Sequence, residues 1–95
     1  MAEKITDAEM WEIVGYIKVS AIRLNILKSL KGSFLMPSEI ARMTGYRTTQ
    51  ISNSLRELKE RKLVQCLNED AKKGRIYQNT ELGMLILEVL DSDRS

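Results

Sequence analysis

The feature that most constrains this chain is a single glycine between two short helical patterns. Residues 37–44 begin with a proline, which is tolerated at the first position of a helix, and the glycine that follows them, Gly45, is a helix-ending residue. After a three-residue turn, apolar residues recur at i, i+4 and i+7, which predicts a helix over residues 48–62 with an inward face made by Ile51, Leu55 and Leu58. We therefore expect two helices joined by a tight glycine turn.

Two further helices and a short strand are predicted before this pair. Apolar residues at helical spacing predict one helix over residues 7–18. A second follows Ser20, a candidate N-cap, and ends at the basic residue and glycine of positions 31–32. Residues 33–36 are too few for a helix and precede a proline, which favours extended backbone, so a short strand is expected there.

The C-terminal third predicts a hairpin and a last helix. Residues 63–68 and 75–79 lack helical periodicity and predict two strands, and the polar loop between them ends in Gly74. A final helix is expected from Thr80 to about residue 91, with a main apolar stripe of Leu82, Leu85, Ile86, Val89 and Leu90. The predicted fold is mostly α with a small antiparallel β-hairpin (α+β), in the order α-α-β-α-α-β-β-α.

The length and composition point to one domain over residues 1–95. A chain of 95 residues can bury one modest core but not a core and a separate catalytic lobe. Its 43% of hydrophobic and 29% of charged residues are an ordinary globular mix, so it is expected to fold. Its apolar runs are far shorter than the ~20 residues that cross a bilayer, and its start lacks a signal pattern. We therefore expect a cytoplasmic protein without membrane contact.

The residue types argue against catalysis and metal binding. The chain has no histidine, the commonest general base near neutral pH, so no serine or cysteine triad can be drawn. Its one cysteine, Cys66, cannot form an internal disulfide and is expected to be a small core residue. Without His and with a single Cys, the usual ligands of transition metals are missing. We expect no enzyme activity, no cofactor and no metal.

Positive charge is concentrated in the middle of the chain. Residues 36–79 hold nine Lys and Arg against five Asp and Glu, whereas the last 16 residues hold one against four. A local basic surface on a nearly neutral protein is typical of a phosphate-binding face. This charge and the order of the elements, which is helix, glycine turn, helix and basic hairpin, predict a winged helix-turn-helix. In that fold the second helix of the pair enters the major groove of double-stranded DNA.

The candidate DNA contacts fall into two groups. Five short polar side chains on the outward face of helix 48–62 are candidates for reading base edges: Thr48, Thr49, Gln50, Ser52 and Asn53. Two of them, Gln50 and Asn53, could pair bidentately with adenine. Basic side chains are candidates for backbone contacts: Arg47 and Arg56 beside that face, and Lys72, Lys73 and Arg75 in the hairpin. The basic hairpin loop, residues 69–75, is called the wing below. It is expected to lie on the backbone or in the minor groove.

Two thirds of the chain resembles a known family. Residues 40–45, the pair Ile51-Ser52, residues 55–64 and 72–77, and Thr80 with Gly83 look like the DNA-binding core of ArsR/MarR-type winged-helix regulators, especially compact archaeal members. The resemblance implies operator binding, usually by a homodimer, with no metal because the metal-binding motifs of the sensing members are absent. Arg47 stands where many members have a capping serine, and Asn79 where many have leucine.

Apolar residues outside the main helical stripes suggest a homodimer. They lie on the first and last helices and comprise Trp11, Tyr16, Met84 and Leu87. The alternative is that they pack within one chain. The polar face of helix 48–62 could likewise be an ordinary solvated face, and the lysines of the wing could protect a sheet edge. The rival function is a winged helix used for protein contact in the transcription machinery, and an accessory domain of a larger enzyme also stays open.

Overall fold

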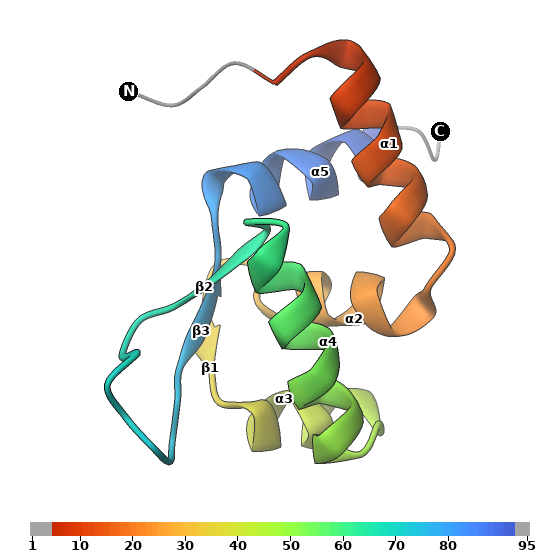
Figure 1. Ribbon diagram of the computed structural model, residues 1–95. Coiled ribbons are helices and arrows are strands. Elements are labelled where there is room, and N and C mark those ends of the chain that lie inside the picture. The colour runs from red at the N-terminus through yellow and green to blue at the C-terminus, as the bar shows by residue number, and fades with distance from the viewer. Residues whose placement is uncertain (1–4, 93–95) are drawn as a thin grey trace.

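The predicted order of helices and strands is confirmed by the computed structural model of the chain, which describes residues 5–92 (Figure 1). The helices are α1 (Asp7–Lys18), α2 (Ala21–Ser29), α3 (Pro37–Thr44), α4 (Thr48–Glu60) and α5 (Glu81–Ser92). The strands are β1 (Phe34–Leu35), β2 (Val64–Cys66) and β3 (Tyr77–Asn79). Helices α1 and α5 lie at one end of the molecule, α3 and the start of α4 lie at the other, and α4 runs between the two ends while the wing projects from the side.

Local signals explain most of the helix boundaries. Ser20 caps α2 by accepting a hydrogen bond from the Arg23 backbone N–H, and Thr80 accepts one from the Gly83 N–H at the start of α5. Gly45 ends α3 in the left-handed conformation, with φ of 84°, which a residue with a side chain rarely adopts. Helix α4 ends at Glu60, two residues earlier than expected, because Lys62 also takes a positive φ of 64°.

The three strands form one antiparallel sheet in the order β1-β3-β2. Strand β3 is central, with Tyr77 opposite Leu35 on one side and Cys66 on the other. Both hairpin strands are shorter than expected. The regular ladder stops because the side chain of Asn68 takes over the Ile76 backbone N–H at 2.8 Å, in place of a strand partner.

The core joins all five helices to the hairpin. Its fully buried side chains come from every helix and from the segment that leads into β2, and they include Ile17, Ile26, Leu27, Ile40, Ile51, Leu55, Leu58, Leu63 and Ile86. The predicted inward face of α4 is confirmed, since its three apolar residues have no exposed surface. This packing holds the opposite face of α4 toward solvent.

The predicted orientation of α5 is wrong by part of a turn. Leu87 was placed off the main apolar stripe, but it is buried in the core with 3% of its surface exposed, beside Ile86 and Leu90. Leu85 and Val89, assigned to that stripe, are only partly buried. The reason is Gly83, which lies directly against the backbone of Leu63 and so turns the face of residues 83, 86, 87 and 90 inward. Leu87 is therefore not available to a dimer interface.

Candidate nucleic-acid interface

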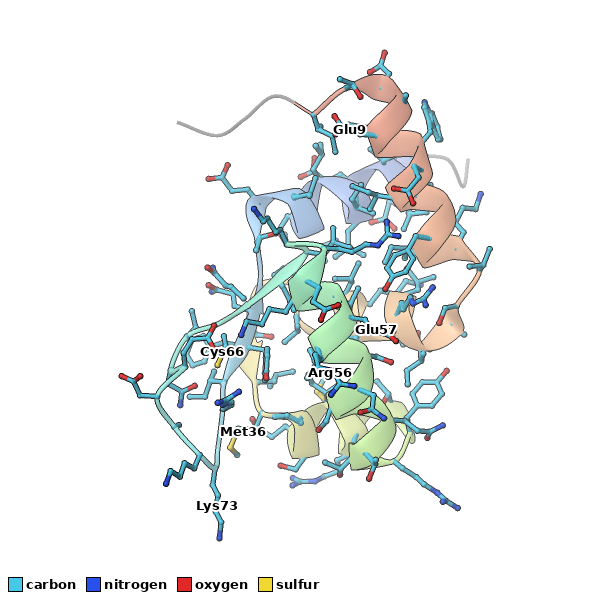
Figure 2. The ribbon with its side chains drawn as sticks, in the orientation of Figure 1. Glu9, Met36, Arg56, Glu57, Cys66 and Lys73 are labelled. Atoms are coloured by element: carbon cyan, nitrogen blue, oxygen red, sulfur yellow. The ribbon has the colours of Figure 1, made fainter. Side chains whose placement is uncertain are left out.

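The outward face of α4 carries the five predicted base-reading side chains. All five are exposed, and they occupy the first half of the helix: Thr48, Thr49, Gln50, Ser52 and Asn53. Between them, Ile51 and Ser54 are buried, so the helix separates a polar outer face from an apolar inner one. Figure 2 shows this helix running along the front of the molecule, with Arg56 on its outer side. The structure thus brings these residues together on one accessible surface.

Gln50 and Asn53 differ in how free they are to contact a base. The Gln50 side-chain oxygen accepts a hydrogen bond from the Arg47 backbone N–H at 3.0 Å, which caps the start of α4. A bidentate pair with adenine uses both the oxygen and the nitrogen of an amide, so the Gln50 oxygen would have to serve the base and the capping bond together or release the cap. Within residues 5–92 the Asn53 side chain makes no hydrogen bond. Asn53 is therefore the better placed of the two.

Basic side chains flank this polar face. Arg47 precedes α4, Arg56 lies one turn beyond Ser52, and both are exposed. Between Arg47 and Arg56 the sequence has no carboxylate. Lys72 and Lys73 are exposed in the wing, and Figure 2 shows Lys73 at its far end. Arg47 and Arg56 thus bracket the exposed half of α4 with positive charge, and the two lysines add positive charge on the wing.

Arg75 has a different role from the one that its charge suggested. Its Nε donates to the Ala71 carbonyl at 2.8 Å and its Nη2 donates to the Glu69 carbonyl at 3.2 Å. The Asn68 side chain adds a bond to the Gly74 carbonyl at 3.1 Å. Arg75 therefore holds the backbone of the wing in shape, and only its remaining N–H groups can reach a phosphate. Sequence reasoning missed this role, because the sequence does not show which carbonyl groups a loop arginine will contact.

An ion pair joins the wing to α4. Lys59, near the end of α4, donates to Glu69 at 2.8 Å, and this bond raises the pKa of the Lys59 ammonium above its ordinary value. Both partners are partly exposed, so the pair contributes little to stability. It links Glu69, at the base of the wing, to the C-terminal half of α4.

A stacked cluster joins α4 to α1 and α2. The Tyr16 ring lies between two guanidinium groups, with Arg23 at 3.8 Å and Arg61 at 3.9 Å from its centroid. Arg23 also pairs with Glu57 at 3.8 Å, and Arg61 with Glu12 at 2.9 Å. Both faces of the ring are thus covered inside one chain, which leaves less of Tyr16 for a dimer interface than expected. Sequence reasoning missed the cluster, whose members are up to 49 residues apart.

The rest of the predicted dimer set is divided between exposed and packed positions. Trp11 has 58% of its surface exposed, and it borders a shallow groove with Leu85 and Val89 on α5. Met84 is half-buried, and its sulfur lies 3.6 Å from the Asn79 amide nitrogen. An accessible apolar surface is therefore present on α1 and α5, but it is centred on Trp11.

Other chemistry is sparse in the described part of the chain. Within residues 5–92, His, Cys, Asp and Glu side chains form no group of three that could hold a metal ion. Cys66 is half-buried and lies 3.5 Å from the Asn68 side-chain oxygen. None of the described helices is both long enough and apolar enough to cross a bilayer.

Comparison with solved structures identifies the fold. No family model and no curated protein matches the sequence. TubR of Bacillus thuringiensis serovar israelensis, solved with 24 bp of tubC, is similar to this chain with a TM-score of 0.78 and 14% identity, over 97% of this chain and 99% of TubR. A transcriptional regulator of the MarR family from Enterococcus faecalis V583 gives 0.74 and 18%, over 96% of this chain and 84% of that one.

Longer regulators match over part of their length. A mutant MarR from E. coli, solved in complex with operator DNA, gives a TM-score of 0.71 and 20% identity, over 87% of this chain and 61% of that one. The chain spans about half of Lactococcus lactis ZitR, 51% of its length. The likeness to compact archaeal members stays a prediction. At the level of the fold the resemblance is confirmed: this chain has the winged helix-turn-helix fold of MarR-type transcription regulators.

Proposed function

We propose that residues 1–95 act as a single domain that binds double-stranded DNA sequence-specifically and regulates transcription. In this proposal α4 enters the major groove, and the wing lies on the backbone or in the minor groove. The observation that carries the proposal is the exposed half of α4, where five short polar side chains stand between Arg47 and Arg56. The DNA present with TubR and with E. coli MarR supports it by analogy of fold.

The polar and the basic residues of this interface would have different roles in binding DNA. The polar residues of α4, with Asn53 foremost, would read base edges, because they can both donate and accept hydrogen bonds. Arg47, Arg56, Lys72 and Lys73 would contact phosphates and set the position of the helix without reading sequence. Arg75 would act mainly by keeping the wing in shape, as its bonds to the loop carbonyls indicate.

Charge favours DNA over a protein partner. A winged helix that binds protein would tolerate carboxylates on the exposed face of its second helix. In α4 the carboxylates are Glu57 and Glu60, both in its last turn, and Glu57 already pairs with Arg23 inside the chain. The half of α4 that would meet a partner therefore has no carboxylate and is flanked by Arg47 and Arg56, which suits phosphate. Catalysis is not part of the proposal.

We also propose that the protein is a homodimer, because two-fold pairing matches two DNA half-sites about one helical turn apart. Trp11 would lie at the centre of the interface, with Met84 and part of Tyr16 at its edge. The exposed apolar surface of α1 and α5 supports this arrangement, since burying it removes apolar area from water.

The test of DNA binding is fluorescence anisotropy with a mixed pool of duplex DNA at two salt concentrations. We expect wild-type affinity to fall steeply with salt, and the double variant K72A/K73A to weaken binding equally for all sequences and to reduce the salt slope by about 2. The variant Q50A/N53A should lose sequence preference but keep the salt slope. K28A/K31A removes the same charge from α2 and the turn after it, and it serves as the control.

Two results would contradict the proposal. One is the absence of binding at low salt. The other is a K28A/K31A variant that weakens binding as much as K72A/K73A, which would mean that general positive charge, and not the wing, holds the DNA. The first result would redirect the search to a protein partner, and the second would remove the role assigned to the wing.

The dimer is tested by sedimentation at tens of micromolar. Trp11→Lys should convert a wild-type dimer to monomer, because it places a charge at the centre of the proposed interface. Phe34→Lys is the matched control, since Phe34 is an aromatic residue with the same exposed fraction of 58% but lies in β1. A monomeric wild type, or equal dissociation by both variants, would remove the dimer proposal.

A further inference from the structure

The outward face of α4 has one central stripe. Thr49, Asn53 and Arg56 recur at i, i+4 and i+7, and each stands two positions before one of the three fully buried apolar residues of the inner face. Two positions correspond to about 200° around an α-helix, so this stripe points away from the core. Ser52 lies to one side of the stripe and Gln50 to the other. The stripe is therefore the part of α4 that reaches deepest into a groove.

Two residues of this stripe are free to meet a base. The side chains of Thr49 and Asn53 are exposed, and neither makes a hydrogen bond with any residue from 5 to 92. Both lie in the first half of α4, and the N-terminal residues of a recognition helix are those that contact base edges. Arg56 lies nearly one turn farther along, where the helix leaves the bases for the backbone.

The amide of Asn53 distinguishes adenine from guanine. Its oxygen can accept from the N6 amino group of adenine while its nitrogen donates to N7. Guanine presents two acceptors, N7 and O6, at the same edge, so the amide oxygen would face another acceptor there. The side chains that bind both guanine acceptors are Arg and Lys, and residues 48–55 contain neither. The centre of α4 therefore favours adenine over guanine.

Thr49 adds a methyl group one turn before Asn53. The C5-methyl group of thymine is the apolar feature of the major-groove edges, and a threonine methyl group can pack on it. Cytosine lacks that methyl group and offers an amino donor instead. Contact with Thr49 therefore favours thymine.

The other candidate contacts discriminate little between bases. The hydroxyl groups of Thr48 and Ser52 can donate or accept, so they suit any base. The one arginine of the wing, Arg75, uses two of its N–H groups on loop carbonyls. The choice of base pair thus falls on the central stripe of α4.

We propose that this protein selects A·T base pairs where the centre of α4 meets the major groove. Adenine pairs with Asn53, a thymine methyl group packs on Thr49, and guanine is disfavoured at both positions. The inference rests on the proposed DNA binding and deepens it, since it names the kind of base pair that the site selects. Asn53 determines the specificity, whereas the basic residues hold any duplex.

The test is selection of binding sites by the full chain from a duplex library with a randomised centre. Adenine should exceed guanine about 10- to 100-fold at one position, which is the discrimination that a bidentate pair provides. N53A should remove this excess at that position alone, and N53R should replace it with an excess of guanine. T49S should lower the frequency of thymine at a neighbouring position, whereas T49V retains a methyl group and should retain the thymine.

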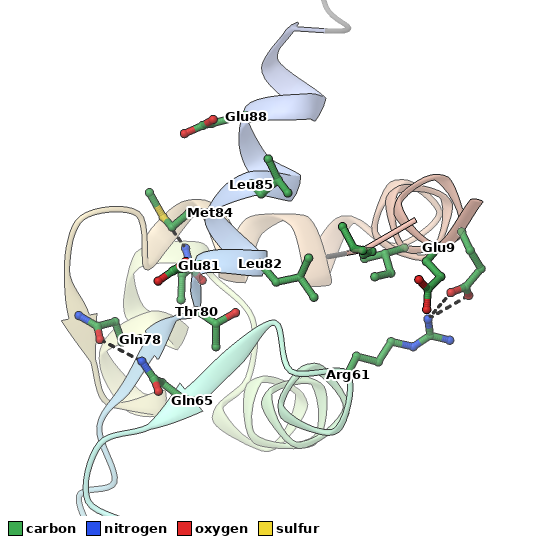
Figure 3. A pocket seen from close by; sticks show the side chains of 14 residues that line it. Glu9, Arg61, Gln65, Gln78, Thr80, Glu81, Leu82, Met84, Leu85 and Glu88 are labelled. Carbon is green, nitrogen blue, oxygen red and sulfur yellow. Dashed lines mark hydrogen bonds and ion pairs between the residues drawn. The ribbon is translucent and has the colours of Figure 1, made fainter. Parts of the chain in front are cut away.

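The matched control is Gln65→Ala, which removes an exposed amide from β2. Figure 3 shows Gln65 bonded to Gln78 beside a cleft whose rim carries Glu9, Glu81 and Glu88. Carboxylates repel the phosphates of DNA, so the duplex should stay away from this side of the molecule. Q65A should therefore leave the base frequencies unchanged at every position.

The outcomes separate this inference from the proposed function. No binding at low salt, or binding without any base preference, contradicts both. A preference for G·C pairs at the position that N53A changes, or a base preference that N53A and Q65A alter equally, overturns the inference and leaves sequence-specific DNA binding standing. N53R keeps the test decisive, because a variant that fails to fold cannot gain a preference for guanine.

Discussion

Gly83 should be the glycine whose substitution costs most stability. A Cβ atom added there would overlap the carbonyl oxygen of Leu63, and it would lie 3.3 Å from the Leu63 carbonyl carbon and 3.5 Å from the Asn79 Cβ. The Leu63 carbonyl cannot move away easily, because it accepts a hydrogen bond from the Thr80 N–H and its own side chain is fully buried. Gly83→Ala therefore has to push α5 away from the start of β2.

The expected cost follows from two opposing effects. Overpacking against backbone should cost about 3 kcal/mol, at the upper end of what an extra methyl group costs in a packed core. Alanine in place of glycine in a helix returns about 1 kcal/mol. The free energy of unfolding of Gly83→Ala should therefore fall by about 2 kcal/mol. For a domain of this size that lowers the midpoint of thermal unfolding by roughly 8–16 °C.

Gly15 provides the matched control, because it also lies in a helix but has no atom within 4 Å of its added Cβ. Gly15→Ala should raise the free energy of unfolding by up to about 1 kcal/mol through helix propensity alone. Both variants can be followed by urea unfolding with far-ultraviolet circular dichroism, at two protein concentrations so that association is detected. If both substitutions stabilise the protein equally, the close approach of α5 to Leu63 is not real.

Two smaller predictions concern the N-terminal helix. Tyr16→Leu should lower the free energy of unfolding by about 1–2 kcal/mol, because it removes two cation–π contacts worth about 0.5–1 kcal/mol each. Tyr16→Phe keeps both contacts and should lose less. Equal losses of the two variants in urea unfolding would refute the stacking of the arginines on the Tyr16 ring. The pKa of Glu9 lies below its ordinary value because its carboxylate makes hydrogen bonds to the backbone and the hydroxyl of Thr6. This capping contact therefore stabilises the fold at pH values above the pKa of Glu9 in the unfolded chain. The stabilisation is lost as the pH falls through the pKa of Glu9 in the folded protein. Thr6→Val should raise the pKa of Glu9 partway in an NMR titration, and an unchanged value would contradict this.

The helix-turn-helix was predictable because its signals are local. The proline at the start of α3, the left-handed Gly45 and the apolar spacing of α4 each act within a few residues, so they survive any tertiary arrangement. The end of α4 was missed because Lys62 adopts a positive φ without being a glycine. Nothing in the residue type marks such a position.

The orientation of α5 was not predictable, because nearly every residue of its middle turns is apolar. The predicted stripe correctly included Ile86 and Leu90, but it added Leu85 and Val89 on one side where the structure buries Gly83 and Leu87 on the other. Gly83 decides between them, since only that face lets the helix lie against the backbone of Leu63. The same limit applies to Arg75, whose partners are carbonyl groups fixed by the loop conformation.

The cluster around Tyr16 explains how α4 can be positioned from the far end of the molecule. Arg61 directly follows α4, and its guanidinium is held at once by the Tyr16 ring and by Glu12 on α1. Exposed ion pairs are weak and are screened by salt, whereas stacking on a ring covers part of the guanidinium and depends less on salt. The ring should therefore carry most of the link between α1 and the C-terminal end of α4. It follows that Tyr16→Leu should change the orientation of α4 at any salt concentration, while Glu12→Gln should matter mainly at low salt.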